Sequence, residues 1–164
     1  MVETLHTYLD DATGAVVTYG PVVYLVWRAY HSTAPIDAAE LAVTDLARRF
    51  GAGRTLFYVH RAPADAKITS NPKVREAAMA HFEKHDGRFA AAAVAIEAEG
   101  FGASIVRSVT AGVLLVRQTD VRSKTFQDAR AGVRWLGSIS QGATRFDAEA
   151  MVGALEEAKL CSTR

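Results

Sequence analysis

Two histidines stand four residues apart in a segment that reads His-Phe-Glu-Lys-His. On a helix, His81 and His85 would lie on one face, and this is a spacing found between two ligands of one metal ion. The helix of the zinc proteases has glutamate directly after its first histidine, whereas Phe82 stands there in this chain. Because the sequence offers no evident third ligand, we interpret His81 as a partly buried histidine and His85 as a cation at a helix end. The pair is kept only as a candidate for a metal, and no cofactor is expected.

A third histidine, His60, ends a predicted strand over residues 55–60. Ligands of open α/β sheets bind outside the carboxyl ends of the strands, so His60 is the best placed histidine for a site. Asp65 is the nearest carboxylate in the loop that follows. The alternative is a histidine that simply finishes a strand. An enzyme that uses His60, or the pair at 81 and 85, is our last-ranked hypothesis, and no residue is assigned as catalytic.

A glycine turn, Gly100-Phe101-Gly102, follows a predicted strand and precedes a predicted helix. Asp120 lies about twenty residues further on, which is the offset found in dinucleotide-binding sites. The third glycine of that motif is replaced by Ile105, which would obstruct close packing of helix on strand. We therefore interpret the segment as a tight turn in which Phe101 contacts the core edge or a partner surface.

The loop from Arg61 to Ser70 is the most unusual irregular segment. It leaves the carboxyl end of a strand and leads to a helix that Asn71 and Pro72 are predicted to start. A phosphate on Thr69 or Ser70 would meet free N–H groups and the positive end of the helix dipole. The alternative is ordinary capping, since helix starts favour serine, threonine and asparagine.

Composition fits one intracellular globular domain. The chain has 164 residues, 49% of them hydrophobic and 23% charged, with a formal net charge of +1. This balance gives no electrostatic reason to expect nucleic acid or membrane insertion. The single cysteine, Cys161, cannot form an internal disulfide and is expected to lie in a fraying helix end. With no signal segment evident, the cytoplasm is the expected location.

The pattern of elements predicts an α/β fold. Apolar segments at 22–29 and 89–96 indicate buried strands, and helices are predicted between the strands. Asp37 is expected to cap the first of these helices, with Glu40 in its capping box. Such alternation gives parallel pairing, and an N-terminal hairpin makes the sheet mixed. We expect one mixed sheet with helices mainly on one face, over residues 1–137, followed by a linker and C-terminal helix over 138–164 that packs on the domain or on a partner.

From Leu5 to Leu136 the order of elements resembles the STAS-like family, named for sulfate transporters and anti-sigma-factor antagonists. The similarity includes the strand Leu56–Val59 with its loop, the strand Ala91–Ile96, and the closing Thr125-Phe126-Gln127-Asp128-Ala129. This resemblance implies a non-catalytic domain that docks onto a kinase or an anti-sigma factor, with control by phosphorylation in some members. The chain lacks the family's Asp-Ser or Asp-Thr pair in that loop, and Thr69 and Ser70 are the nearest substitutes.

The sequence is therefore compatible with three functions. The first is a regulatory, protein-binding domain of bacterial signalling, with a kinase, an anti-sigma factor or a second copy of the chain as partner. Self-association as a homodimer is compatible with all three functions. The alternative is a small-molecule or lipid-binding domain whose pocket is lined by the strand 22–29 and the helix 109–116, with Tyr24, Tyr58 and His60 as its polar groups. The enzyme hypothesis ranks third.

Overall fold

The computed structural model describes residues 2–66, 71–97, 104 and 121–161. Within these ranges the chain forms one sheet, whose strands are β1 (His6–Asp10), β2 (Gly14–Tyr19), β3 (Val22–Trp27), β4 (Leu56–Ala62), β5 (Phe89–Ile96) and β6 (Arg122–Phe126). Their spatial order is β1-β2-β3-β4-β5-β6. The first three pair antiparallel, and β3 to β6 pair parallel. The predicted α/β fold with a single mixed sheet is confirmed.

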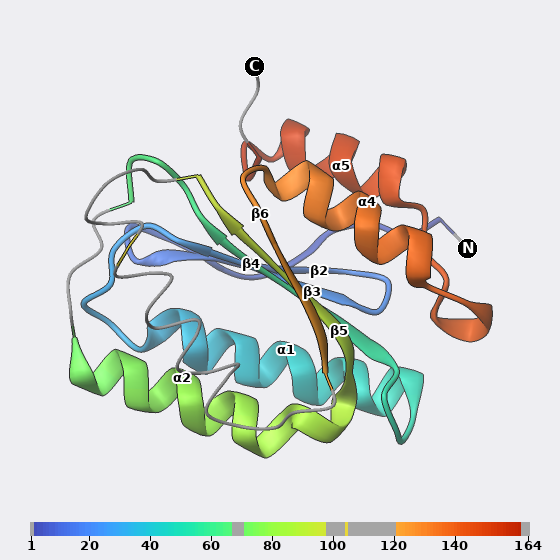
Figure 1. Ribbon diagram of the computed structural model, residues 1–164, viewed down its shortest axis with the longest axis horizontal. Helices are drawn as coiled ribbons and strands as arrows, with labels where there is room; N and C mark the ends of the chain where they lie inside the picture. The colour runs from blue at the N-terminus through green and yellow to red at the C-terminus, as the bar shows by residue number, and fades with distance from the viewer. Residues whose placement is uncertain (1, 67–70, 98–103, 105–120, 162–164) are drawn as a thin grey trace.

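Helices cover both faces of this sheet (Figure 1). The longer ones are α1 (Ala34–Phe50), α2 (Pro72–His85), α4 (Ala129–Ile139) and α5 (Ala148–Glu157), with short 3-10 turns at Asp86–Arg88 and Gly142–Thr144. In the described part of the chain, α1 and α2 lie on one face and α4 and α5 on the other. Among the described residues the helices therefore lie on both faces, and not mainly on one as expected. The reason is that β2 to β5 are apolar on both sides and each side needs a cover.

The face under α1 and α2 carries a core rich in aromatic side chains. Alternate residues of the central strands, such as Leu25 in β3 and Tyr58 in β4, pack against Ala39 and Val43 of α1 and Val74 of α2. The Asn71 side chain accepts hydrogen bonds from the amides of Lys73 and Val74, so α2 begins where the sequence predicts.

The start of α1 differs from the prediction. The helix begins at Ala34 after Thr33, with Pro35 in its first turn. Asp37 therefore lies inside the helix, where its carboxylate accepts a hydrogen bond from the Thr33 hydroxyl at 3.2 Å. Because the cap is four residues earlier, Glu40 is not a capping residue, and its side chain is available for other contacts.

The opposite face is closed by α4 and α5. Met151, Val152 and Leu155 of α5 belong to the same buried cluster as Tyr24 and Val133. A Cβ added to Gly132 of α4 would lie 3.1 Å from the Cβ of Ala93 in β5, so helix and alanine-rich strand are in close contact. The small side chains of β5 allow this approach, as the sequence indicates. The C-terminal helix is thus part of the hydrophobic core.

No helix in the described residues is long and apolar enough to cross a membrane.

We expect the Leu155→Ala substitution to lower the free energy of unfolding by about 2–5 kcal/mol, because it leaves a cavity beneath α5. Leu41→Ala is the matched control, since Leu41 is 62% exposed while Leu155 is fully buried. The control should change stability by less than about 0.5 kcal/mol. Urea denaturation followed by circular dichroism measures both. Equal effects of the two substitutions would contradict a core role for α5.

Candidate functional site

Several residues singled out from the sequence meet between α2 and the sheet. The ring of Tyr58 lies 4.8 Å from that of His60 and 5.9 Å from that of His81, measured between centroids. His81 in turn lies 5.1 Å from His85. We call Glu40, Tyr58, His60, His81 and His85 the histidine cluster.

Glu40 reaches this cluster from α1. Its Oε2 atom lies 2.9 Å from His81 Nδ1 and 2.8 Å from His85 Nε2. The ammonium group of Lys84 donates a hydrogen bond to the other carboxylate oxygen, Oε1. The sequence does not indicate Glu40 as a site residue, because its spacing from Asp37 is typical of a capping box. The available signal was a charged residue on α1. Its partners on α2 are identified only by the way in which the two helices pack.

The charge of Glu40 is strongly stabilised in this position. Partial burial opposes ionisation, but hydrogen bonds from Lys84, His81 and His85 outweigh it and lower the pKa of Glu40 to about 2. For His81 the balance is reversed. Burial lowers the pKa of His81 more than its hydrogen bond to Glu40 raises it. The neutral form of His81, which has a lone pair on one ring nitrogen, is therefore favoured.

His60 and Tyr58 place further polar atoms in the core. Trp27 donates its indole N–H to His60 Nδ1 at 3.4 Å, which fixes the proton of neutral His60 on Nε2. Burial lowers the pKa of His60 to about 3, with a smaller contribution from the neighbouring His81. In the described part of the chain, His60 Nε2, His81 Nε2 and the Tyr58 hydroxyl are buried without a hydrogen-bond partner. The cluster therefore holds neutral donors and acceptors in an apolar surrounding, with one carboxylate at its edge.

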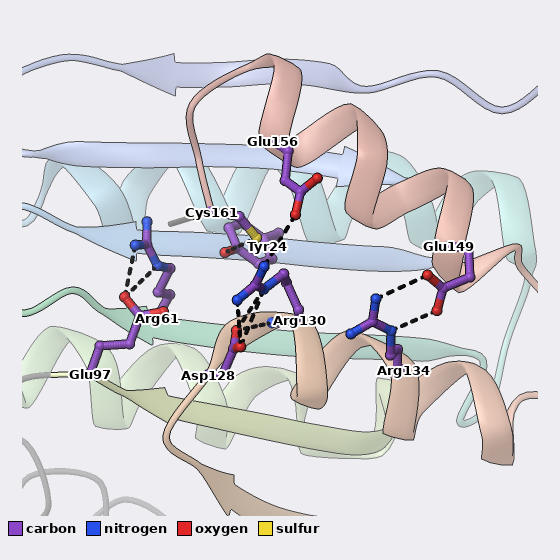
Figure 2. A network of polar contacts seen from close by, with 9 residues as sticks. All are labelled: Tyr24, Arg61, Glu97, Asp128, Arg130, Arg134, Glu149, Glu156 and Cys161. Atoms are coloured by element: carbon purple, nitrogen blue, oxygen red, sulfur yellow. Dashed lines mark hydrogen bonds and ion pairs between the residues drawn. The ribbon is translucent and has the colours of Figure 1, made fainter. Parts of the chain in front are cut away.

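A second polar region lies on the opposite face, where β4 meets the end of α5 (Figure 2). Arg61 is 8% exposed, and its Nε and Nη2 atoms donate to Glu97 Oε2 at 3.0 and 2.7 Å. Its Nη1 atom donates to the carbonyl oxygen of Leu160 at 2.8 Å. Burial opposes the charge of Arg61, but the carboxylate of Glu97 outweighs it and raises the pKa of the guanidinium.

This ion pair lies beside a cleft of about 830 Å³ at the carboxyl ends of β3 and β4. The walls come from four segments: the turn after β1, the loop after β3, the loop after β4 and the end of α5. The lining residues are Ala12, Val26, Arg28, Ala29, His31, Arg61, Pro63, Asp65, Ala66, Glu156, Glu157, Lys159, Leu160 and Cys161. We call this the carboxyl-edge cleft.

Tyr24 belongs to the cleft side and is separated from Tyr58 and His60. In the register of the parallel pair, Tyr24 stands opposite Val59, so it shares a face with Val59 and not with Tyr58. Its hydroxyl donates to the Leu160 carbonyl at 2.9 Å. A single pocket lined by Tyr24, Tyr58 and His60 is therefore not formed. Asp65 also lies apart from His60, in the wall of the carboxyl-edge cleft.

Cys161 is buried rather than frayed, which corrects the sequence expectation. The helix ends at Glu157, and Lys159 adopts a positive φ of 57° that turns the chain back toward the sheet. Cys161 Sγ then lies 3.8 Å from the Tyr24 hydroxyl. Burial raises the pKa of the Cys161 thiol, which disfavours the nucleophilic thiolate. The candidates Thr69, Ser70 and Phe101 lie outside the described residues.

No family model, curated protein or solved structure matches this chain. The resemblance to the STAS-like family therefore remains a prediction from the sequence.

We expect the stability of the protein to fall as the pH is lowered from about 6.5 toward 3, because His60 stays neutral in the folded state down to about pH 3. In the unfolded chain His60 takes up a proton near pH 6.5. The unfolded state then binds the extra proton, so this residue contributes a slope of at most about 1.4 kcal/mol per pH unit.

His60→Phe should flatten this slope in urea denaturation at a series of pH values. His6→Phe, at an exposed position of β1, is the control and should keep the wild-type slope. An unchanged slope in the His60 variant would show that other groups cause the acid sensitivity.

Proposed function

We propose that this protein is a non-catalytic regulatory domain that recognises a partner protein at the carboxyl-edge cleft. The observation that carries the proposal is this cleft itself, which the loops after β3 and β4 and the chain after α5 form together at one end of the sheet. The first part of the loop between β4 and α2, including Pro63 and Asp65, forms one wall. In the STAS-like family, the loop before the second helix carries the regulatory site.

The cleft presents groups suited to a polar protein segment. Arg28 and Lys159 lie in its walls together with Glu156 and Glu157, so both signs of charge face the same opening. Arg28 is also paired with Asp10 at 2.5 Å, and Glu156 with Arg130 at 3.5 Å. Fixed charges of this kind contribute more to the specificity for a partner and to its orientation than to the strength of binding. An extended segment with alternating charges is the occupant that matches them.

The order of the described strands does not form the crevice of a nucleotide-binding sheet. Such crevices form where the strand order reverses. Here the order from β3 to β6 runs in one direction. The cleft is instead completed by the residues that follow α5, Lys159 to Cys161. This arrangement favours recognition of a partner over binding of a dinucleotide.

A small polar molecule is the second candidate occupant. The volume of about 830 Å³ lies within the range of small-molecule sites. With such an occupant the protein would be a ligand-binding domain, and its binding site would be the carboxyl-edge cleft rather than the pocket expected from the sequence.

We expect Ala66→Trp to abolish partner binding, because the indole would fill the cleft from its wall. Ala52→Trp is the matched control, since Ala52 is exposed in the turn after α1. Affinity purification from the native cell lysate, with quantitative mass spectrometry, should show one protein retained by wild type and control but reduced at least about tenfold with the cleft variant.

Native mass spectrometry of the same samples distinguishes the second candidate. A small adduct that is present on wild type and absent from the Ala66 variant would favour a small-molecule ligand. Identical sets of proteins and adducts for all three chains would overturn a binding role for the carboxyl-edge cleft.

A further inference from the structure

The contact between α1 and α2 brings three metal-binding side chains together on the face opposite the carboxyl-edge cleft. Glu40, His81 and His85 each offer one ligand atom, and the three atoms lie within 4.8 Å of one another. Two imidazole nitrogens and one carboxylate oxygen form the ligand set of several zinc sites that keep a fourth position open. We propose that Glu40, His81 and His85 bind one divalent transition-metal ion, with Zn²⁺ the best match to the ligands.

The two distances from Glu40 to the imidazole nitrogens require only a small adjustment. With zinc–ligand bonds of about 2.0–2.1 Å, tetrahedral ligands lie roughly 3.3 Å apart. Glu40 Oε2 is 2.9 Å from His81 Nδ1 and 2.8 Å from His85 Nε2. An ion bound between them would lengthen each of these two oxygen–nitrogen distances by about 0.5 Å. Rotation of the Glu40 side chain supplies this movement, and the His81 and His85 nitrogens, which lie within 4.8 Å of each other, approach to about 3.3 Å as the ion is bound.

The surroundings hold the ligands in place. Lys84 donates to Glu40 Oε1, which leaves Oε2 directed at the two rings. Hydrogen bonding of a ligating carboxylate through its other oxygen is typical of metal sites. The His81 ring is packed edge-on against Phe82, with centroids 5.7 Å apart. The site is therefore preorganised by packing and by one positive side chain that can remain in place.

The site is also accessible from one side. The side chain of His81 is 1% exposed and that of His85 11%, whereas that of Glu40 is 29% exposed. An ion would enter past the carboxylate and meet the buried nitrogens last. Water is available at the Glu40 side to complete the coordination.

Metal binding would change the tautomer of His81. A neutral ring that donates from Nδ1 to Glu40 carries no proton on Nε2. When Nδ1 binds a metal, the proton must move to Nε2. One proton leaves Nδ1 and one is taken up at Nε2, so the change of tautomer releases no net proton from this ring. It also gives a signal for the ion at this residue that does not depend on any activity.

The test uses the full chain without an affinity tag, titrated with Zn²⁺ in competition with a chromophoric chelator. We expect one ion per chain, and a loss of affinity of at least about tenfold in Glu40→Gln and in His85→Gln. Glu76→Gln and His6→Gln are the matched controls at exposed positions, and both should bind as wild type does. Co²⁺ in place of Zn²⁺ should give the visible absorption of tetrahedral cobalt.

Long-range ¹H–¹⁵N spectra should show the His81 proton on Nε2 only after Zn²⁺ is added. Circular dichroism of the metal-free variants checks that they are folded; if Glu40→Gln does not fold, His85→Gln and the wild-type spectra still decide. Equal affinity in all variants would assign binding to surface histidines and overturn the proposal. Absence of binding to the wild type, or an unchanged His81 tautomer, would overturn it as well. None of these outcomes depends on the carboxyl-edge cleft.

Discussion

The structure depends on a sheet whose central strands are apolar on both faces. Every residue of β2 and β3 is buried, and β4 and β5 are nearly so. A sheet of this kind is stable only when both faces are covered. The crossover helices α1 and α2 cover one face, and the chain after β6 supplies α4 and α5 for the other. The C-terminal helix is therefore required by the sheet. Ion pairs from Arg130 to Glu156 and from Arg134 to Glu149 join α4 to α5 (Figure 2).

The same constraint divides the polar residues of β4 between two separate regions. Successive side chains of a strand point to opposite faces. His60 therefore enters the aromatic core beneath α2, while Arg61 enters the polar network beneath the end of α5. Side chains of the histidine cluster and side chains of the polar network around Arg61 therefore lie on opposite faces of the sheet. The sheet lies between them, and the loop after β3 reaches both, since Ala29 and His31 line the cleft while Tyr30 packs on Trp27.

Much of the fold could be predicted from local signals. Asn71, Asp128 and Asp147 each accept hydrogen bonds from the first turn of a helix, as their position before an apolar pattern indicates. The two-sided burial of residues 22–27 follows from apolar residues at both parities. The grouping of site residues could not be predicted in this way. Glu40 and His81 are 41 residues apart, and their contact depends on how α1 and α2 pack. Tyr24 and Tyr58 separate because of strand register, which a single strand pattern does not define.

The composition of the histidine cluster argues for a role beyond stability. A buried donor or acceptor without a partner costs about 1–3 kcal/mol, whereas an apolar residue of the same shape costs nothing of this kind. Tyr58, His60 and His81 each carry such an atom among the described residues, and phenylalanine would fill the position of Tyr58 without it. The nearby carboxylate of Glu40 adds a charge that three hydrogen bonds must hold. A core optimised for stability alone would not gather these groups in one place. Coordination of one metal ion would explain why Glu40, His81 and His85 lie together, which hydrophobic packing does not explain.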